Sequence, residues 1–315
     1  MTIAYLISAH TDAPQLKRLI EALHPDAHYF IHIDKKSDIN QFTSIIKGIN
    51  IHFIEDRVDV RWGTILEVEY QMNLIKAAVE FPTYFERIFF LSGLDYPLWS
   101  NDRITDWLDH HRDKEIIQGI QMNTEDISDE QKIMYTTPRP FFAYEKLNNK
   151  WNMRLGVLAR KYNKLKGVTK PLSFMCTNPV GLNPSFLPMP EMWSLYKGSA
   201  WWCISQDLAQ HVYESYKRCP EIRKYFLDSF GQAETVIQTI VFNNYDLAKK
   251  CTHTRGKYPG LVALTPLHHI VYDPVIKIMD ETDYDTLMAS GKMFTRKVVS
   301  GKSDKLVEMI DNGRK

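Results

Sequence analysis

The chain has 315 residues, of which 44% are hydrophobic and 24% are charged, values typical of a globular protein with a sizeable core. Its 39 lysines and arginines balance 38 aspartates and glutamates, so the formal net charge is only +1. This balance argues against a basic nucleic-acid-binding protein and against a highly charged disordered chain. The sequence contains no run of about 18 apolar residues, and its first residues lack the features of a signal peptide.

Four cysteines are scattered along the chain and form neither a Cys-x-x-Cys pair nor a Cys/His zinc pattern. They are Cys176, Cys203, Cys219 and Cys251. This spacing is typical of a reducing compartment, in which buried thiols pack as small hydrophobic groups. We therefore expect free, structural cysteines and a cytoplasmic location.

Strand-like and helix-like runs alternate through the first 120 residues. Strands are predicted at residues 3–8, 28–33, 51–54, 87–91 and 115–120, and helices at 14–23, 64–79 and 101–110. The second helix opens with Thr64-Ile65-Leu66-Glu67, which matches the S/T-x-x-E capping box. Strands that alternate with helices predict an α/β fold with a mostly parallel central sheet flanked by helices.

The sequence changes character after about residue 122. Residues 146–190 contain eight lysines and arginines but no acidic residue, and residues 177–190 have the Pro, Asn and Gly content of a loop. Further helices are predicted between Ser205 and Cys219, at 234–243 and at 304–310. Because no repeat or linker divides the chain, we expect a single domain, residues 1–315, with lobes at 1–122 and 123–315.

Several common catalytic motifs are missing from the sequence. No Gly-x-Gly-x-x-Gly follows a strand, and neither Gly-x-Ser-x-Gly nor His-Glu-x-x-His occurs. Gly301-Lys302-Ser303 matches the end of a P-loop, but Arg296 stands where that loop requires its first glycine. The single Asp-x-Asp triplet, at 283–285, lies far from the predicted strand ends, and we interpret it as surface. These features argue against an oxidoreductase with a dinucleotide cofactor and against a P-loop enzyme.

Four sequence segments occur in an order that is informative. The first pairs residues 3–10 with 29–37, the second is 60–64, the third is 89–98, and the fourth pairs 198–205 with 232–239. This order resembles the core-2/I-branching β-1,6-N-acetylglucosaminyltransferase family, which also contains the peptide O-xylosyltransferases, over residues 3 to about 299. The resemblance implies a GT-A type α/β fold, a UDP-sugar donor, inversion at the anomeric centre and no requirement for a metal ion or other cofactor. The chain lacks the family's usual membrane anchor and disulfide set, as a bacterial, cytosolic relative would.

The resemblance implies that Glu234 is the catalytic general base. In an inverting transfer one carboxylate accepts the proton of the acceptor hydroxyl while the oxygen attacks the anomeric carbon. Ala233 stands where the family has an acidic residue before this glutamate. The alternative is a structural role, because a glutamate at a helix start interacts favourably with the helix dipole.

The diphosphate leaving group gains negative charge in the transition state, and cations stabilise it when no metal is bound. Residues 294–298 match the segment that carries the family's lysine, which implies this role for Lys297. The family's upstream arginine is replaced by His268, and Arg296 could compensate for that replacement. The alternative is a solvated basic tail.

The resemblance implies that four further residues bind the donor. Asp34 and His10 would line the uridine pocket at the carboxyl edge of the sheet, Trp62 would lie beside the nucleotide, and Asp95 would lie near the donor sugar. Either aspartate could instead stabilise a turn, and Trp62 could instead pack in the core.

Trp201 and Trp202 are candidates for acceptor binding, with one facing the acceptor and the other the core. The leading interpretation is an inverting glycosyltransferase that uses UDP-N-acetylglucosamine, or UDP-xylose, and modifies a glycan or glycolipid. The replacements at Ala233 and His268 keep open a non-catalytic UDP-sugar-binding relative with a decayed active site. No residue of the sequence identifies the acceptor.

Residues 146–170 interleave lysines and arginines with apolar side chains. A basic amphipathic segment of this kind can lie on an anionic bilayer, which predicts a peripheral contact with the inner face of the membrane. The alternatives are an ordinary solvated helix beside the acceptor cleft and a basic patch that binds an acidic acceptor.

Overall fold

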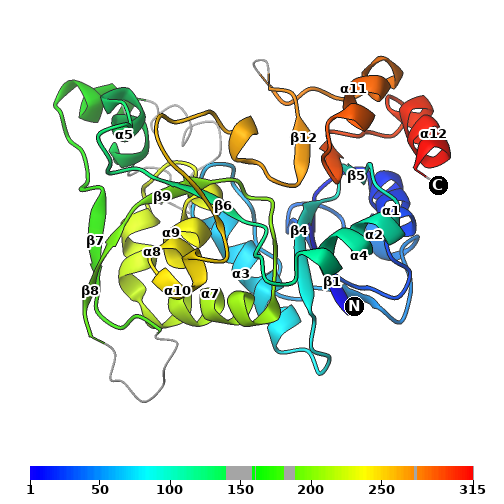
Figure 1. Ribbon diagram of the computed structural model, residues 1–315, viewed down its shortest axis with the longest axis horizontal. Coiled ribbons are helices and arrows are strands. Elements are labelled where there is room, and N and C mark those ends of the chain that lie inside the picture. Colours follow the sequence, from blue (N-terminus) through cyan, green and yellow to red (C-terminus); the bar gives the residue numbers. More distant parts are fainter. Residues whose placement is uncertain (140–157, 160, 181–188, 273–274, 315) are drawn as a thin grey trace.

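The computed structural model describes residues 1–139, 158–159, 161–180, 189–272 and 275–314. A five-stranded sheet in the order β10-β4-β1-β2-β3 forms its centre (Figure 1). The strands are β1 (Ile3–Ala9), β2 (His28–Ile33), β3 (Ile51–Phe53), β4 (Arg87–Ser92) and β10 (Cys203–Ile204). Neighbouring strands are parallel except for β10, which runs antiparallel to β4. The predicted α/β fold with a mostly parallel sheet is confirmed, and it agrees with the GT-A type fold that the resemblance implies.

Both faces of the sheet are buried because successive side chains of a strand point to opposite faces. Ala4 and Leu6 of β1 join one hydrophobic cluster, which includes side chains from α3 (Leu66–Val79), α7 (Gln206–Arg218) and α9 (Val236–Phe242). Tyr5 and Ile7 join a second cluster, with side chains from α1 (Ala13–Ala22), α4 (Asn101–His110) and α12 (Asp304–Gly313). The chain therefore forms three layers, with the sheet between two groups of helices.

Three smaller sheets extend this centre. One has the order β11-β6-β9, another β12-β13-β5, and β7 pairs with β8. Their strands are β5 (Asp95–Pro97), β6 (Gln118–Gln121), β7 (Ser173–Cys176), β8 (Glu191–Ser194), β9 (Tyr196–Gly198), β11 (Thr252–Thr254), β12 (His268–Ile270) and β13 (Phe294–Arg296). The remaining helices are α2 (Asn40–Thr43), α5 (Asp129–Thr136), α8 (Pro220–Phe226), α10 (Tyr245–Ala248) and α11 (Tyr284–Ala289), with short 3-10 turns η2 (Gln232–Glu234), η3 (Val262–Leu264) and η4 (Glu281–Asp283).

The C-terminal residues return to the N-terminal half of the molecule. Strand β13 pairs with β5, so that Arg296 lies opposite Asp95, and α12 packs in the same cluster as α1 (Figure 1). The hydroxyl of Tyr96 donates a hydrogen bond to Asp311 at 2.9 Å. The division into lobes at residue 122 stays a prediction.

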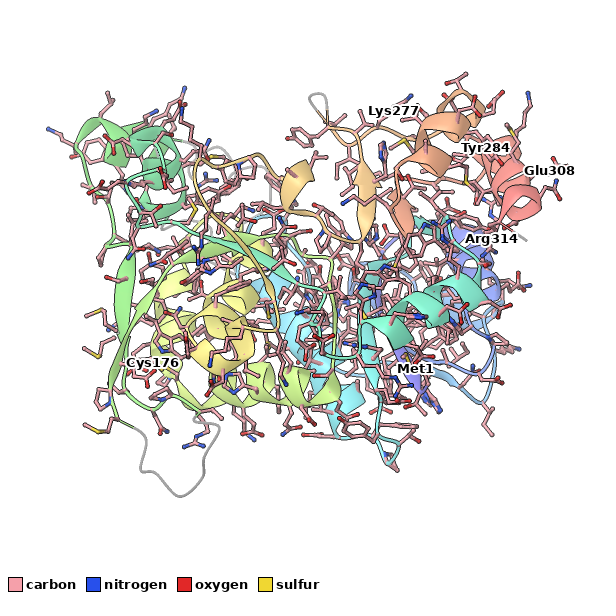
Figure 2. The ribbon with its side chains drawn as sticks, viewed as in Figure 1. Met1, Cys176, Lys277, Tyr284, Glu308 and Arg314 are labelled. Atoms are coloured by element: carbon pink, nitrogen blue, oxygen red, sulfur yellow. A yellow bond between two sulfur atoms is a disulfide. The ribbon has the colours of Figure 1, made fainter. Side chains whose placement is uncertain are left out.

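Two sequence predictions need correction. The structure pairs Cys176 with Cys219 in a disulfide, with Cα atoms 6.0 Å apart, although we expected free cysteines throughout. The two positions are 43 residues apart and become neighbours only because β7 packs against α8. Cys176 lies far from Met1 and Arg314 in Figure 2. The other correction concerns the helix predicted at 234–243, because Glu234 closes the turn η2 and α9 begins at Val236.

The predicted membrane-surface segment falls largely outside the described residues. Within it, residues 158–159 and 161–165 are helical. None of the helices in the described ranges is long and apolar enough to cross a membrane.

Candidate active site

A cavity of about 690 Å³ opens at the carboxyl ends of the parallel strands. Ser8 and His10 reach it from β1 and the loop that follows, and His32 and Asp34 from β2 and its loop. Open α/β sheets bind ligands at this edge, because the loops that leave the strands diverge there. Much of the remaining lining is apolar or aromatic. It includes Met134, Tyr135, Trp201, Phe230, Tyr258, Leu261, Val262, Ile270, Tyr272 and Ile276.

Glu234 lies on the wall of this cavity at the end of η2. The turn that carries it begins at Gly231, whose φ of 65° favours glycine, and Glu234 N–H donates to Gly231 O at 3.0 Å. Its Oε2 forms an ion pair with Nζ of Lys197, which is fully buried on β9. Burial lowers the pKa of Lys197, and the charge and hydrogen bond of Glu234 oppose that effect. The pair therefore fixes the Glu234 carboxylate in the wall.

Lys197 was not predicted from the sequence. It lies in the strand Tyr196–Gly198, in which all three residues are buried. A lysine in a buried strand is a signal in itself, because a buried ammonium group requires a partner. The sequence offers no way to tell that this partner lies 37 residues later.

A second charged group is built around Asp95, which is fully buried on β5. Its Oδ2 accepts hydrogen bonds from Ser92 N–H at 2.7 Å and from His268 Nε2 at 3.0 Å. Its Oδ1 accepts a hydrogen bond from Nη1 of Arg296 at 3.0 Å. Burial opposes ionisation of Asp95, but the charges of His268 and Arg296 and these hydrogen bonds outweigh it, so that the pKa lies below its ordinary value.

Arg296 lines the cavity, whereas Asp95 and His268 lie behind the wall. The Arg296 guanidinium lies 5.4 Å from the ring centroid of Trp201, and its Nε is buried without a hydrogen-bond partner among the described residues. Lys297 is absent from the described lining of the cavity, and burial and the charge of Arg296 lower its pKa. Of the three cations predicted to stabilise the leaving group, Arg296 is the one that the structure brings to the cavity.

Of the predicted donor-binding residues, His10, Asp34 and Trp62 line the cavity, whereas Asp95 does not. Asp34 accepts hydrogen bonds from the N–H group and the Nζ of Lys36, both at 3.0 Å, and so stabilises a turn. The same residue also lines the cavity. Burial lowers the pKa of His10, whereas the negative charge of Asp34 acts to raise it. Trp62 is 73% exposed at the opening and meets the ring of Phe230 edge to face.

The two tryptophans that were predicted as acceptor candidates point to different environments. Trp201 lines the cavity, and Trp202 is fully buried with its ring stacked on Phe90 at 5.4 Å. Of the two alternatives, Trp202 therefore faces the core, and Trp201 is the one that can reach a ligand.

Glu67 also lines the cavity, and the sequence analysis assigned it only to a capping box. Helix α3 begins at Leu66 without that box, because the chain enters it through a tight turn. Thr64 Oγ1 accepts a hydrogen bond from Leu66 N–H at 3.3 Å, and Glu67 Oε2 accepts one from Gly63 N–H at 2.8 Å. The capping-box prediction is therefore wrong, and it concealed a second carboxyl group at the site.

No group of three or more His, Cys, Asp or Glu side chains in the described ranges is arranged to bind a metal ion. The predicted independence of metal ions and cofactors stays a prediction. Asp283 and Asp285, the predicted surface triplet, lie at η4 and the start of α11.

A family model described as Core-2/I-Branching enzyme matches residues 3–259. The chain belongs to the Core-2/I-Branching enzyme family. The identification from four sequence segments is confirmed. The match includes Glu234 and the predicted donor-binding residues, whereas His268, Arg296 and Lys297 lie beyond its end.

Among curated proteins, this member of the Core-2/I-Branching enzyme family is similar to xylosyltransferases. It is 30% identical to human xylosyltransferase 2 over 123 residues, which are 37% of this chain and 14% of the human protein. It is 27% identical to the xylosyltransferase of Ciona intestinalis, again over 37% of this chain and 14% of that protein. The aligned region is thus a small part of these much longer relatives.

Two solved structures are similar to the chain at a low level. Glucosyl-3-phosphoglycerate synthase from Mycobacterium tuberculosis, in complex with Mn²⁺ and UDP, has 12% identity and a TM-score of 0.32, with 81% of this chain and 70% of that chain covered. Mouse xyloside xylosyltransferase 1 has 12% identity and a TM-score of 0.31, with 81% and 85% covered. Similarity at this level carries no conclusion about substrate or mechanism.

Proposed function

We propose that this protein is an inverting glycosyltransferase that moves a sugar from a UDP-sugar to a hydroxyl group of a glycan or glycolipid. The observation that carries the proposal is the placement of Glu234 and Arg296 on one cavity at the carboxyl edge of the sheet. N-acetylglucosamine is the favoured donor sugar, and xylose is the alternative. Family membership and the similarity to xylosyltransferases support this assignment.

In the proposed reaction Glu234 is the general base. Its carboxylate accepts the proton of the acceptor hydroxyl while that oxygen attacks the anomeric carbon and the bond to the diphosphate breaks. Lys197 fixes the orientation of the carboxylate through the ion pair. Ala233, which replaces an acidic residue of the family, lines the same cavity and leaves this pair intact.

Arg296 is the proposed cation for the diphosphate leaving group. Asp95 accepts a hydrogen bond from Nη1 of its guanidinium, and Arg296 lines the cavity. An arginine can place several N–H groups against phosphate oxygens and stays charged at every relevant pH. His268, which is outside the described lining of the cavity, donates a hydrogen bond to the other carboxylate oxygen of Asp95. Asp34, His10 and Trp62, which line the same cavity, would bind the nucleoside.

Turnover without a metal ion is the first prediction. Because side chains supply the positive charge at the leaving group, we expect transfer or slow hydrolysis of UDP-N-acetylglucosamine or UDP-xylose to persist in excess EDTA. UDP should raise the melting temperature under the same conditions. Released UDP and a thermal-shift assay measure the two effects.

The other outcomes of this experiment are informative. Activity that is lost on chelation and restored by manganese would contradict metal independence. Stabilisation by UDP without turnover of any UDP-sugar, with a range of glycan acceptors present, would favour the non-catalytic alternative with a decayed site.

A second prediction concerns a membrane-linked acceptor. In the described part of the basic segment, Leu158, Tyr162 and Leu165 are spaced for one helical face and are 61%, 60% and 86% exposed. Lys161 and Lys164 lie between them, so that the helix combines apolar and cationic groups. We expect the protein to sediment with phosphatidylglycerol-rich vesicles at low salt and to be released at high salt.

A variant that combines Leu158→Ser and Leu165→Ser should weaken this binding without changing UDP affinity. Equally weak binding of the wild type to neutral and to anionic vesicles would contradict the membrane contact. In that case the segment would be an ordinary solvated helix or an acceptor-binding patch.

A further inference from the structure

The cavity contains a second carboxyl group, that of Glu67, in surroundings unlike those of Glu234. Glu67 lies in the first turn of α3 and is partly exposed to the cavity. Its Oε2 is held by the N–H group of Gly63, whose φ of 73° is a conformation that favours glycine. The backbone therefore fixes this side chain at the wall.

The two carboxyl groups differ in their charged partners. Glu234 is paired with Lys197, whereas the described residues form no ion pair with Glu67. Burial and the nearby charge of Glu234 raise the pKa of Glu67 to about 7, and the hydrogen bond from Gly63 opposes the rise only in part. Carboxyl groups in one site whose surroundings favour different protonation states commonly take different catalytic or binding roles.

The groups that face Glu67 come from several elements. Glu234 faces it from η2, with Lys197 of β9 behind it. Tyr70 follows one turn later on α3, and its ring stacks at 5.1 Å on His32 of β2. Burial lowers the pKa of His32 to about 4, so His32 is neutral at pH 7. From α7, Tyr216 donates its hydrogen bond to Glu69 rather than to Glu67. Among the described residues, the charge that acts directly on Glu67 is that of Glu234, which is itself paired with Lys197.

We propose that the protonated carboxyl group of Glu67 donates a hydrogen bond to an ether oxygen of the acceptor sugar, next to the hydroxyl that Glu234 deprotonates. This inference rests on the proposed function. An ionised carboxylate can only accept hydrogen bonds, so a protonated one lets the site bind a ring or glycosidic oxygen, which has no proton to donate and which a second carboxylate would repel. The acceptor it selects has two neighbouring oxygens, one as nucleophile and one as hydrogen-bond acceptor.

This arrangement has a consequence for pH dependence. As the pH rises through about 7, Glu67 loses its proton and adds a second negative charge beside Glu234. The hydrogen bond to the acceptor is lost at the same time. The KM for the acceptor should therefore rise on the alkaline side, whereas the affinity for UDP should change less.

The test compares three variants. Glu67→Gln keeps a neutral hydrogen-bond donor of the same shape, so we expect its acceptor KM at pH 6 to lie well below that of Glu67→Ala and to show no alkaline rise. Glu67→Ala removes the donor and should raise the acceptor KM by about 10-fold or more at pH 6, with UDP affinity little changed. Glu69→Gln is the matched control on the same helix, because Glu69 pairs with Arg223 away from the cavity, and it should retain the wild-type pH profile.

A direct measurement uses the unliganded wild-type protein with ¹³C-labelled glutamate, in which the carboxyl resonance that disappears in Glu67→Gln is titrated. A midpoint near neutral pH is expected, and a midpoint near that of a free glutamate would overturn the inference whether or not the protein is an enzyme. The inference also fails if Glu67→Gln is as impaired as Glu67→Ala, or if Glu67→Gln keeps the alkaline rise. A wild type that binds UDP but transfers no sugar would overturn the proposed function and the acceptor role, while the titration would still decide the protonation state.

Discussion

Replacing Glu234 with glutamine is expected to lower the rate of sugar transfer by about 100- to 10,000-fold, because removal of a general base has effects of this size. Glutamine keeps the shape of the side chain, and its amide oxygen can still approach the buried ammonium of Lys197. It cannot accept the proton of the acceptor hydroxyl. The affinity for UDP should stay near that of the wild type, because glutamine keeps the shape of the wall and leaves Asp34 and Trp62 unchanged. Released UDP in the presence of acceptor measures the rate, and calorimetry measures UDP binding.

A matched control for this variant is Glu80→Gln, which changes an exposed glutamate at the end of α3, outside the described lining of the cavity. It should leave transfer and UDP binding unchanged. Transfer within about threefold of the wild-type rate in Glu234→Gln would exclude Glu234 as the general base. Loss of UDP binding together with transfer would instead indicate that the variant disturbs the cavity as a whole.

The sequence predicts the central sheet well because its signals are local. The runs at 3–8, 28–33 and 87–91 correspond to β1, β2 and β4 within one residue at each end. Each is a mostly apolar run, as expected for a strand that is buried on both faces. The loops after these strands then place His10 and Asp34 at the carboxyl edge, where the cavity lies.

The charged groups of the site could not be predicted in the same way, because long-range pairing brings them together. Asp95 meets Arg296 through the antiparallel pairing of β5 with β13, across 201 residues of sequence. Each of these strands has only three residues, so neither carries a periodic pattern that identifies it. The resemblance pointed to Lys297 and to His268, with Arg296 to compensate for the histidine, and of these three residues Arg296 is the one in the described lining of the cavity.

Glu67 shows a different limit of sequence reasoning. A threonine followed three residues later by a glutamate predicts a capping box, and the helix does begin there. The Glu67 carboxylate accepts its hydrogen bond from the N–H group of Gly63. Gly63 has a positive φ, and the sequence pattern does not specify this backbone conformation. A capping box would use the N–H group of Thr64, one residue later, whereas the observed contact is with Gly63 and Glu67 lines the cavity.

The buried cluster around Asp95 leads to the largest expected effect on stability. Replacing Asp95 with asparagine leaves the buried His268 and Arg296 without a carboxylate, and breaking a buried ion pair in this way typically costs about 3–5 kcal/mol. The pKa of Asp95 is lowered in the folded state, so its contribution is complete above the unfolded-state pKa of about 4 and is lost as the pH falls through the folded-state value. Urea unfolding should therefore show a large loss at pH 7 that shrinks at pH 3.

The same change should weaken UDP binding, because Asp95 positions Arg296 at the cavity. Asp285→Asn, on an exposed aspartate of α11, is the control and should change the free energy of unfolding by less than about 0.5 kcal/mol. A loss below about 1 kcal/mol at pH 7 for Asp95→Asn would show that the cluster does not depend on this charge. A loss of equal size at pH 7 and pH 3 would point to packing, because only an ionised carboxylate gives the pH dependence described above.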